Sequence, residues 1–478
     1  MKKTYVIIGN SASGLAAVNK LRELDPGSKI ICISKEQEKP YNKCRMADYL
    51  AGDMPEQGVF LGEREYLPSN NFCGISENTQ ENEIEFIFGA SVQKIVPERI
   101  SGGHTRNSQI PVDPEFSKDG ASDNNRVLLN SGTEIFYDKL FIATGAKPLR
   151  LNVKGAHDAG TFVFHTLQDT NNILKFISER KPKKAVIIGS GMTGMECASA
   201  LHTRKIDVDI IELGTHILSN CCDKVGAEFI ESAIEKRVSG SCENLGHKCE
   251  ESVKDKIGVN IYHNESVKEI ISENGKISCV VLNSGEFIAT DMVVFAVGVR
   301  ADTDLAKDTG IEVGEFGIVT NDYMHTNIAN IYAGGDCAQV KDIVSGHLIR
   351  SNAWHDATTQ GEIAAENMYL SGFDQAVLPE SSSFTESVFD SKPAESMPVK
   401  YAGALPTSYS DIFGVKFASY LGAIKHQLKY EFIFNVGPDF YNKIWLQDGL
   451  VKGFVLIGDI SKIGKLKKSI IGGKRLEL

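Results

Sequence analysis

Two glycine-rich loops constrain this chain more than any other feature. The first occupies residues 9–14, directly after the apolar run at 5–8, and the second occupies residues 189–194, directly after the apolar run at 185–188. Each stands between a strand-like and a helix-like run, an arrangement that holds a dinucleotide pyrophosphate at a helix N-terminus. One such loop is equally compatible with an ordinary strand–turn–helix connection. Two together predict a protein that holds two dinucleotides and passes electrons between them.

The residue types within the loops follow the demands of pyrophosphate binding. The first glycine allows a tight turn, the middle position lets the backbone approach the ligand, and the last glycine lets helix and strand pack closely. The second loop has glycine at all three positions, whereas the first has the small residue Ser11 in the middle. The residues expected to line the dinucleotides are Gly9, Ser11, Ala12, Ser13 and Gly14 in the first loop, and Gly189, Gly191, Met192, Thr193 and Gly194 in the second.

An acid is expected after each loop, near the tip of the next strand, to accept hydrogen bonds from a ribose. Glu212 ends the apolar run 208–211 after the second loop, and no arginine follows it until Arg237. A carboxylate there accepts the ribose hydroxyls of NAD and repels the 2′-phosphate of NADP, so NADH is predicted as the donor. After the first loop the nearest acid is Glu36, preceded by Lys35. Its alternative interpretation is a solvated loop glutamate.

Composition indicates a globular protein of several domains. A chain of 478 residues exceeds what one hydrophobic core organises, and a net charge of −11 argues against a general nucleic-acid or membrane-surface role. No apolar stretch approaches the ~18–20 residues that span a bilayer, and the amino end leads straight into the first strand. We therefore expect a cytoplasmic protein. A basic tail at 462–475 is interpreted as a solvated helix face, and docking of an acidic partner is the alternative.

The ten cysteines are expected to be free thiols. Their spacing is irregular and no Cys-x-x-Cys pair occurs, which argues against a disulfide framework and an iron–sulfur site. The loose Cys/His-rich stretch at 221–249 matches no standard zinc spacing. No metal is expected.

The layout predicts an α/β protein with two Rossmann-like dinucleotide-binding domains, one inserted in the other, plus a C-terminal α+β interface domain. The expected parts are 1–150 and 281–375 for the first domain, 151–280 for the second and 376–478 for the interface domain. Polar segments at 101–125 and 239–255 read as exposed insertions. The segment 285–288 is expected to pair with the strand at 292–298.

Three further segments carry a family resemblance. These are 143–148, 296–302 and the run 332–336, which ends in Gly-Gly-Asp. With both loops, they make the chain similar to the FAD-dependent pyridine nucleotide–disulfide oxidoreductases over nearly its whole length. The resemblance implies FAD at the first loop, NAD(P)H at the second, Asp336 at the ribityl chain of the flavin and Glu196 near the flavin–nicotinamide junction. It also implies a homodimer formed through the terminal domain, and it adds Lys43, Val92, Ala143, Thr144, Gly145 and Gly298 to the expected cofactor-binding residues.

The segment 40–52 resembles two branches of that family. Its Pro-Tyr-Asn and Tyr-Leu-Ala-Gly runs are similar to rubredoxin-reductase and nitrite-reductase flavodomains. Cys44 is similar to the single cysteine of coenzyme A-disulfide reductases, NADH oxidases and NADH peroxidases. The disulfide reductases with an internal dithiol carry Cys-x4-Cys here, so the lone Cys44 excludes that dithiol. The peroxidase branch carries a histidine where this chain has Ala12, which argues against peroxide reduction by that machinery.

These features predict an FAD-dependent NADH oxidoreductase with two open routes for the outgoing electrons. In the first, Cys44 passes them to a disulfide, persulfide or sulfur acceptor, and flanking Lys43 and Arg45 lower the pKa of its thiol. In the second, Cys44 is a bystander and the acceptor is a redox protein such as rubredoxin, or the chain is the flavin subunit of a larger complex. Lys43 and Arg45 then contact the FAD phosphates. A third possibility is that one loop has lost its ligand.

Overall fold

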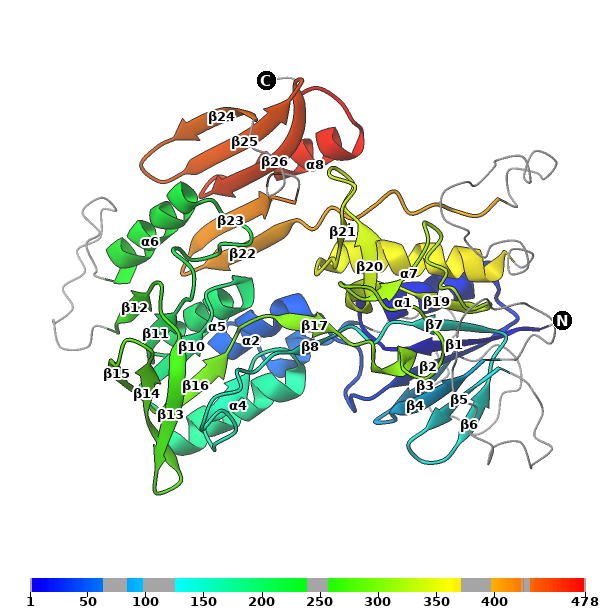
Figure 1. Ribbon diagram of the computed structural model, residues 1–478, viewed down its shortest axis with the longest axis horizontal. Helices are drawn as coiled ribbons and strands as arrows, with labels where there is room; N and C mark the ends of the chain where they lie inside the picture. The colour runs from blue at the N-terminus through cyan, green and yellow to red at the C-terminus, as the bar shows by residue number, and fades with distance from the viewer. Residues whose placement is uncertain are drawn as a thin grey trace.

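The computed structural model describes residues 2–62, 84–97, 125–238, 257–370, 397–422, 424 and 430–476. Figure 1 shows two α/β units side by side, with a third unit above the second one. Most of the expected insertion at 101–125, all of the one at 239–255 and the boundary near 376 lie outside the described residues. Within the described ranges, no helix is both long enough and apolar enough to cross a membrane.

The first unit is built on a five-stranded parallel sheet in the order β19-β7-β1-β2-β3. Alternate residues of these strands enter two different cores, because successive side chains of a strand point to opposite faces. One face packs against helices α1 and α7, and the other against an antiparallel sheet of β4, β5 and β6. The bounds are β1 Thr4–Ile8, α1 Ala12–Leu24, β2 Lys29–Ser34, β3 Ile84–Phe88, β4 Val92–Val96, β5 Arg126–Leu129, β6 Glu134–Phe136, β7 Lys139–Ile142, β19 Ile331–Ala333 and α7 Trp354–Tyr369.

The second unit repeats this plan with the parallel order β12-β11-β10-β16-β9. Helices α4, α5 and α6 contribute to the core on one face, and the antiparallel strands β13, β14 and β15 cover the other. The bounds are β9 Thr161–Val163, α4 Leu167–Arg180, β10 Lys184–Ile188, α5 Met192–Thr203, β11 Asp207–Ile211, α6 Lys224–Val238, β12 Val259–Tyr262, β13 Val267–Glu273, β14 Lys276–Leu282, β15 Phe287–Ala289 and β16 Met292–Phe295.

Two expectations about the second unit are wrong. Strand β16 lies in its parallel sheet, between β10 and β9, so this unit extends to Phe295 and the boundary expected at 280 falls too early. Strand β15 pairs with β14, not with β16. The run from β15 to β16 looks like a hairpin in sequence, but a buried parallel strand is also continuously apolar and pairs with distant segments.

A narrow two-stranded ribbon joins the two units in the middle of Figure 1. It consists of β8 (Ala146–Pro148) and β17 (Val299–Ala301), which run antiparallel. The chain therefore passes from the first unit to the second along β8 and returns along β17, as expected for one domain inserted in another. A small sheet of β18 (Ile318–Val319), β20 (Ala338–Lys341) and β21 (Leu348–Ile349) lies beside the first unit.

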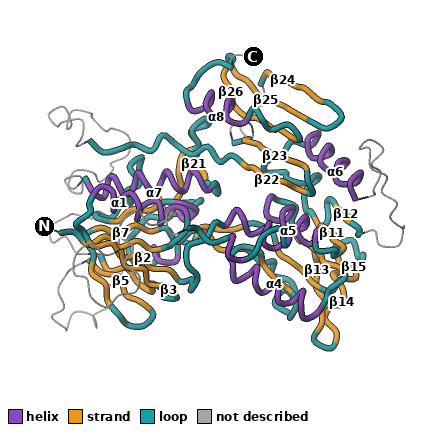
Figure 2. The backbone as a smooth tube through the Cα atoms, turned by 180° about the vertical axis from the view of Figure 1, so that it is seen from behind, coloured by secondary structure: helices purple, strands orange, loops and turns teal. Residues whose placement is uncertain are grey.

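The terminal unit is an antiparallel sheet in the order β22-β23-β26-β25-β24 with one helix, α8. One face packs against α8, and the other joins the core that contains α5 and α6. Figure 2 shows strands β22 and β23 next to these two helices from behind. Helix α8 buries Leu466 and Ile470 and exposes Lys462, Lys465 and Lys468, so the basic tail is a solvated helix face. The bounds are β22 Ser408–Ile412, β23 Val415–Tyr420, β24 Glu431–Val436, β25 Tyr441–Gln447, β26 Leu450–Ile457 and α8 Ile463–Ile471.

Candidate functional site

The first glycine loop connects β1 to α1 and has no room for side chains at its glycines. Gly9 has a φ of +116°, and a Cβ there would lie 2.1 Å from the carbonyl oxygen of Ala143. A Cβ on Gly14 would lie 1.8 Å from the carbonyl oxygen of Gly9. Ser11 is the N-cap of α1, yet its side chain makes no capping hydrogen bond to the helix. The N-terminus of α1 therefore lies close to Ala143. Its free backbone N–H groups can bind a pyrophosphate there.

The second loop has the same geometry between β10 and α5. Gly189 has a φ of +99°, and a Cβ on it would lie 2.5 Å from the carbonyl oxygen of Ala296. Gly191 is the N-cap of α5, and no atom outside its neighbours lies within 4 Å of where its Cβ would be. Met192 begins the helix, Thr193 is exposed and Gly194 is buried. The open space at Gly191 is what the approach of a pyrophosphate requires.

Glu212 lies beside the second loop, directly after β11. Its Oε2 accepts a hydrogen bond from the backbone N of Ser190 at 3.0 Å, and its Oε1 accepts one from the N of Gly214 at 2.6 Å. The Ser190 hydroxyl also donates to Oε2. A carboxylate has about four acceptor sites, so lone pairs remain for a ribose.

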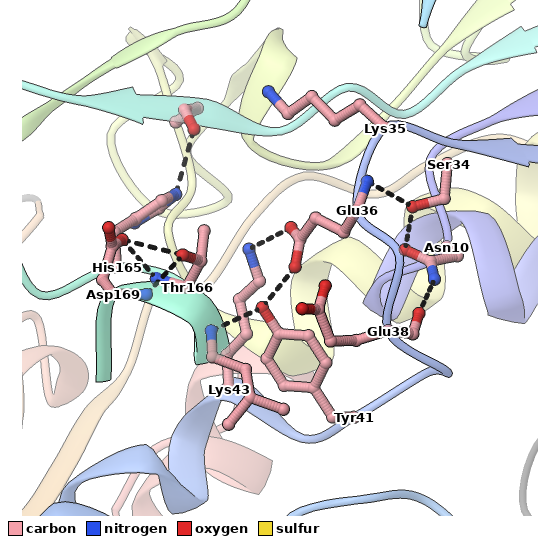
Figure 3. A network of polar contacts seen from close by, with 12 residues as sticks. Asn10, Ser34, Lys35, Glu36, Glu38, Tyr41, Lys43, His165, Thr166 and Asp169 are labelled. Atoms are coloured by element: carbon pink, nitrogen blue, oxygen red, sulfur yellow. Dashed lines mark hydrogen bonds and ion pairs between the residues drawn. The ribbon is translucent and has the colours of Figure 1, made fainter. Parts of the chain in front are cut away.

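Glu36 is held in a polar network at the end of β2, shown in Figure 3. The Tyr41 hydroxyl donates to its Oε2 at 2.7 Å, and the Lys43 Nζ lies 3.8 Å from its Oε1. The Glu36 side chain is only 19% exposed. It is therefore a fixed acid near the first loop rather than a solvated loop glutamate.

The Gly-Gly-Asp segment lies against the first loop and helix α7. Gly335 has a φ of +76°, and its N–H donates to the Oε1 of buried Gln360 at 2.8 Å. The Ser13 hydroxyl packs close to Gly334 and is buried without a hydrogen-bond partner among the described residues. Burial raises the pKa of Asp336 to about 6, and Lys43 and Arg350 oppose the shift.

These features fit two dinucleotides. An orphaned buried hydroxyl at Ser13 and an enclosed carboxylate at Asp336 are both costly without a polar ligand. The glycine positions leave the backbone open at both helix N-termini. The chain thus has a cradle, an acid and a helix end at each of two places.

Cys44 lies in a short 3₁₀ turn, η1 (Lys43–Arg45), which leads into helix α2 (Met46–Ala51). The side chain of Asn42 caps the turn by accepting a hydrogen bond from the Cys44 N at 2.9 Å. Cys44 is exposed by surface area. Even so, desolvation by the surrounding protein, together with the charges of Glu196 and Asp336, raises the pKa of its thiol.

The expectation that Lys43 and Arg45 lower this pKa is wrong. The Lys43 ammonium points to Glu36, and Arg45 donates from Nη1 to the carbonyl oxygen of Gly58 at 2.8 Å. In a 3₁₀ turn, successive side chains point about 120° apart, so neighbours in sequence need not face the same group. The charges that reach the thiol are carboxylates from distant parts of the chain.

Glu196 lies on α5 and is held by the terminal unit. Ser410 of β22 donates its hydroxyl proton to Glu196 Oε1 at 2.7 Å. Burial raises the pKa of Glu196 to about 7, a shift that the Ser410 hydrogen bond opposes and the charge of Asp48 supports. Side chains from all three units therefore interact here: the charges of Asp336 in the first unit and Glu196 in the second act on Cys44, and Ser410 of the terminal unit hydrogen-bonds to Glu196. Ser410 has no sequence signal, because its role depends only on how β22 packs on α5.

Of the remaining expected residues, Thr144, Gly145 and Gly298 lie next to the connecting ribbon, and Val92 lies in the first unit. The Thr144 hydroxyl donates to the carbonyl oxygen of Asp302 at 2.7 Å, and the Asp302 N donates to the carbonyl oxygen of Gly145 at 2.9 Å. Gly298 has a φ of +101° with open space beside it. Val92 begins β4 and packs, partly buried, beneath the first sheet. In the described part of the chain, no group of three or more His, Cys, Asp or Glu side chains is arranged to hold a metal ion.

Comparison with known proteins agrees with this geometry. A family model described as pyridine nucleotide-disulphide oxidoreductase matches residues 3–240 and 237–361. An NADH oxidase of Methanocaldococcus jannaschii is 28% identical over 365 residues, which cover 76% of this chain and 69% of the relative. A rubredoxin-NAD(+) reductase of Pseudomonas putida is 26% identical over 364 residues, covering 76% of this chain and 79% of the relative. The solved structure of a NAD-dependent persulfide reductase from A. fulgidus superposes with a TM-score of 0.75 at 22% identity, covering 99% of this chain and 79% of that one, which shows the shared fold.

Proposed function

This chain belongs to the pyridine nucleotide-disulphide oxidoreductase family, and we propose that it passes electrons from NADH through FAD to a disulfide, persulfide or other sulfur acceptor at Cys44. It is an NAD(P)H-dependent flavoprotein oxidoreductase with FAD and NAD(H) as cofactors. The sulfur acceptor, the preference for NADH and the role of Cys44 are the proposed parts.

Each dinucleotide is assigned to one loop. Residues 9–14, Glu36 and Asp336 would hold FAD, and residues 189–194 with Glu212 would hold NADH. When bound, FAD takes up a hydride from NADH and passes on two electrons. The chain's part is to orient the two cofactors and to set the charge around them.

The observation that carries the proposal is the convergence of Cys44, Glu196 and Asp336 from separate elements. Desolvation and both carboxylates raise the pKa of the Cys44 thiol, so the resting enzyme holds a protonated thiol. Glu196, with a pKa raised to about 7, can accept a proton near neutral pH.

The thiol chemistry balances with a disulfide substrate. The Cys44 thiolate attacks one substrate sulfur, forms a mixed disulfide and releases the first substrate thiolate. Two electrons then reduce the mixed disulfide, which restores the Cys44 thiolate and releases the second substrate thiolate. Overall, one disulfide, one NADH and one proton give two thiols and NAD⁺.

The test is Cys44→Ser in the FAD-loaded protein. We expect anaerobic NADH titration to bleach the flavin with the same two electrons per flavin as in the wild type, because the resting Cys44 thiol is already reduced. Turnover of disulfide and persulfide substrates should be lost, while reduction of an artificial dye continues. Cys279→Ser, in strand β14 of the second unit, is the matched control and should behave as the wild type. Unchanged turnover of every sulfur acceptor in Cys44→Ser would refute the sulfur route.

One observation favours a second candidate, an electron-carrier reductase of the rubredoxin type. A raised thiol pKa disfavours the thiolate, which is the reactive form of cysteine. The relative from Pseudomonas putida is named for a rubredoxin acceptor. In this case Cys44→Ser would retain full reduction of an electron-carrier protein. A tight stoichiometric complex with little activity of the isolated chain would instead indicate a flavin subunit.

The assembly and compartment are also proposed. We infer a homodimer through the terminal unit, whose edge strand β24 exposes Phe432, Phe434 and Val436 on one face. Free thiols at the described cysteines support a reducing compartment, and we place the protein in the cytoplasm. Sedimentation of the FAD-loaded protein tests the dimer.

A further inference from the structure

Tyr41 links the expected FAD acid to the second unit by a continuous chain of hydrogen bonds. Its hydroxyl donates to Glu36 Oε2 at 2.7 Å and accepts from the backbone N of Leu167 at 3.1 Å. Tyr41 is only 4% exposed, and Leu167 is fully buried. Figure 3 shows Tyr41 between Glu36 on one side and the start of α4 on the other.

The N-terminus of α4 depends on this contact. Thr166 and Asp169 form a reciprocal cap, in which the Thr166 hydroxyl accepts from the Asp169 N at 3.1 Å and Asp169 Oδ2 accepts from the Thr166 N at 2.9 Å. Leu167 is the first helical residue, whose N–H has no partner within a helix. Tyr41 satisfies it from another unit. The residue before the cap is also anchored, since His165 Nε2 lies 3.0 Å from the carbonyl oxygen of Ala146 in the ribbon.

The donor and acceptor roles in this series of hydrogen bonds are fixed by the chemistry of Leu167, Tyr41 and Glu36. Burial and the charge of Glu36 raise the pKa of Tyr41 far above its usual value, so the phenol keeps its proton. That one proton goes to Glu36, and the oxygen lone pairs accept from Leu167. Successive hydrogen bonds aligned in this way polarise one another. A change in the charge environment of Glu36 therefore changes the strength of the hydrogen bond from the Leu167 N–H to Tyr41.

We propose that Tyr41 is a positioning residue that sets Glu36 for the ribose of FAD and couples occupancy of that site to the N-terminus of α4. This inference rests on the proposed role of Glu36. It assigns to the fold a direct connection between FAD binding and the unit that holds NADH. The coupling is reciprocal: if FAD binding stabilises the N-terminus of α4, then stabilising the N-terminus of α4 raises the affinity for FAD by the same factor.

A second tyrosine of the same segment provides a matched control. The Tyr49 hydroxyl donates to Asn171 Oδ1 at 2.9 Å, so it also reaches α4 from α2. It has no contact with Glu36 in the described structure. Tyr49→Phe therefore removes one hydrogen bond between the same two regions and leaves the Glu36 network intact.

The experiment compares Tyr41→Phe, Tyr49→Phe and wild type by two readouts that do not use turnover. The first is the dissociation constant of FAD from the apoprotein, measured by flavin fluorescence. We expect it to rise about five- to tenfold in Tyr41→Phe, the effect of losing one typical net hydrogen bond, and to stay unchanged in Tyr49→Phe. The second is hydrogen exchange at the Leu167 amide with and without FAD. The protection that FAD confers should disappear in Tyr41→Phe and persist in Tyr49→Phe.

Glu36→Gln separates the inference from the function on which it rests. If Glu36→Gln leaves FAD affinity unchanged, the assignment of Glu36 to the ribose is wrong. If Glu36→Gln weakens FAD binding but Tyr41→Phe does not, Glu36 keeps its role and the coupling through Tyr41 is overturned. The coupling is also overturned if Tyr41→Phe keeps FAD-dependent protection at Leu167. Loss of that protection in both Glu36→Gln and Tyr41→Phe supports it.

Discussion

Cys44 is the residue whose reactivity depends most on its neighbours. Desolvation and the carboxylates of Glu196 and Asp336 raise the pKa of its thiol. Glu196 itself has a pKa of about 7, so it is largely neutral at pH 6 and ionised at pH 8. The repulsion felt by the Cys44 thiolate therefore grows as the pH rises through 7. The ionised carboxylate of Glu196 therefore disfavours the Cys44 thiolate at pH 8 more than at pH 6.

Glu196→Gln should lower the pKa of the Cys44 thiol, because it removes the carboxylate charge. We expect the rate of Cys44 alkylation by iodoacetamide in the apoprotein to rise about three- to tenfold at pH 8, the effect of removing one nearby charge in a partly solvated site. At pH 6 the two proteins should differ little, because Glu196 is then protonated in the wild type. Asp411→Asn, next to Ser410 on the same strand, is the control and should not change the rate. An equal increase at both pH values would show that the substitution acts through packing instead.

The hairpin of β22 and β23 attaches the terminal unit to helix α5, and its turn is unusual. Phe413 and Gly414 both have positive φ, +50° and +80°, which is the geometry of a two-residue hairpin turn that favours Asn-Gly. A phenylalanine there is strained, and its contacts account for it. Its N–H donates to Ser199 Oγ at 3.0 Å, its carbonyl oxygen accepts from Arg237 at 2.7 Å, and its ring lies edge-on to His202 with centroids 5.5 Å apart. The backbone strain at Phe413 is offset by attachment of the hairpin to two helices.

Phe413→Asn should leave the turn intact and weaken the attachment. Asparagine tolerates positive φ, so the β22–β23 hydrogen bonds should keep their protection from hydrogen exchange. The last turn of α5, which contains Ser199 and His202, should exchange several-fold faster, since the aromatic contact with His202 is lost. Asp448→Asn is the matched control, because Asp448 and Gly449 form the same kind of turn between β25 and β26. Loss of protection throughout the terminal sheet would mean that the phenylalanine holds the hairpin itself.

Much of the molecule was predictable from sequence, and the limits have physical causes. The loops, the buried parallel strands and the hairpin of β5 and β6 follow from local patterns of glycine and apolar residues. The partner of β15 and the second unit's boundary were missed because strand pairing over long distances leaves no local pattern. The expected direction of the Cys44 pKa shift was wrong because it was based on the adjacent residues Lys43 and Arg45, whereas the charges that act on the thiol come from Glu196 and Asp336. Ser410 and the contact between Tyr41 and Leu167 arise only when separate units pack together.

The two tryptophans of the chain lie in different units and can report on each separately. Trp354 begins α7, whose Gln360 and Gly361 pack against the Gly-Gly-Asp turn and the first loop, whereas Trp445 is buried in the terminal sheet. If the first unit holds FAD, removing FAD removes about 2.7 kcal/mol of stabilisation at a ligand concentration of 100 Kd, which corresponds to about 5–11 °C in melting temperature for a unit of this size. Trp445→Phe, which leaves Trp354 as the reporter, should show that full decrease on FAD removal, and Trp354→Phe should show a smaller one by Trp445 fluorescence. Equal decreases would mean that the units unfold as a single cooperative structure, so that the contacts through α5 and Tyr41 are as strong as the cores they join.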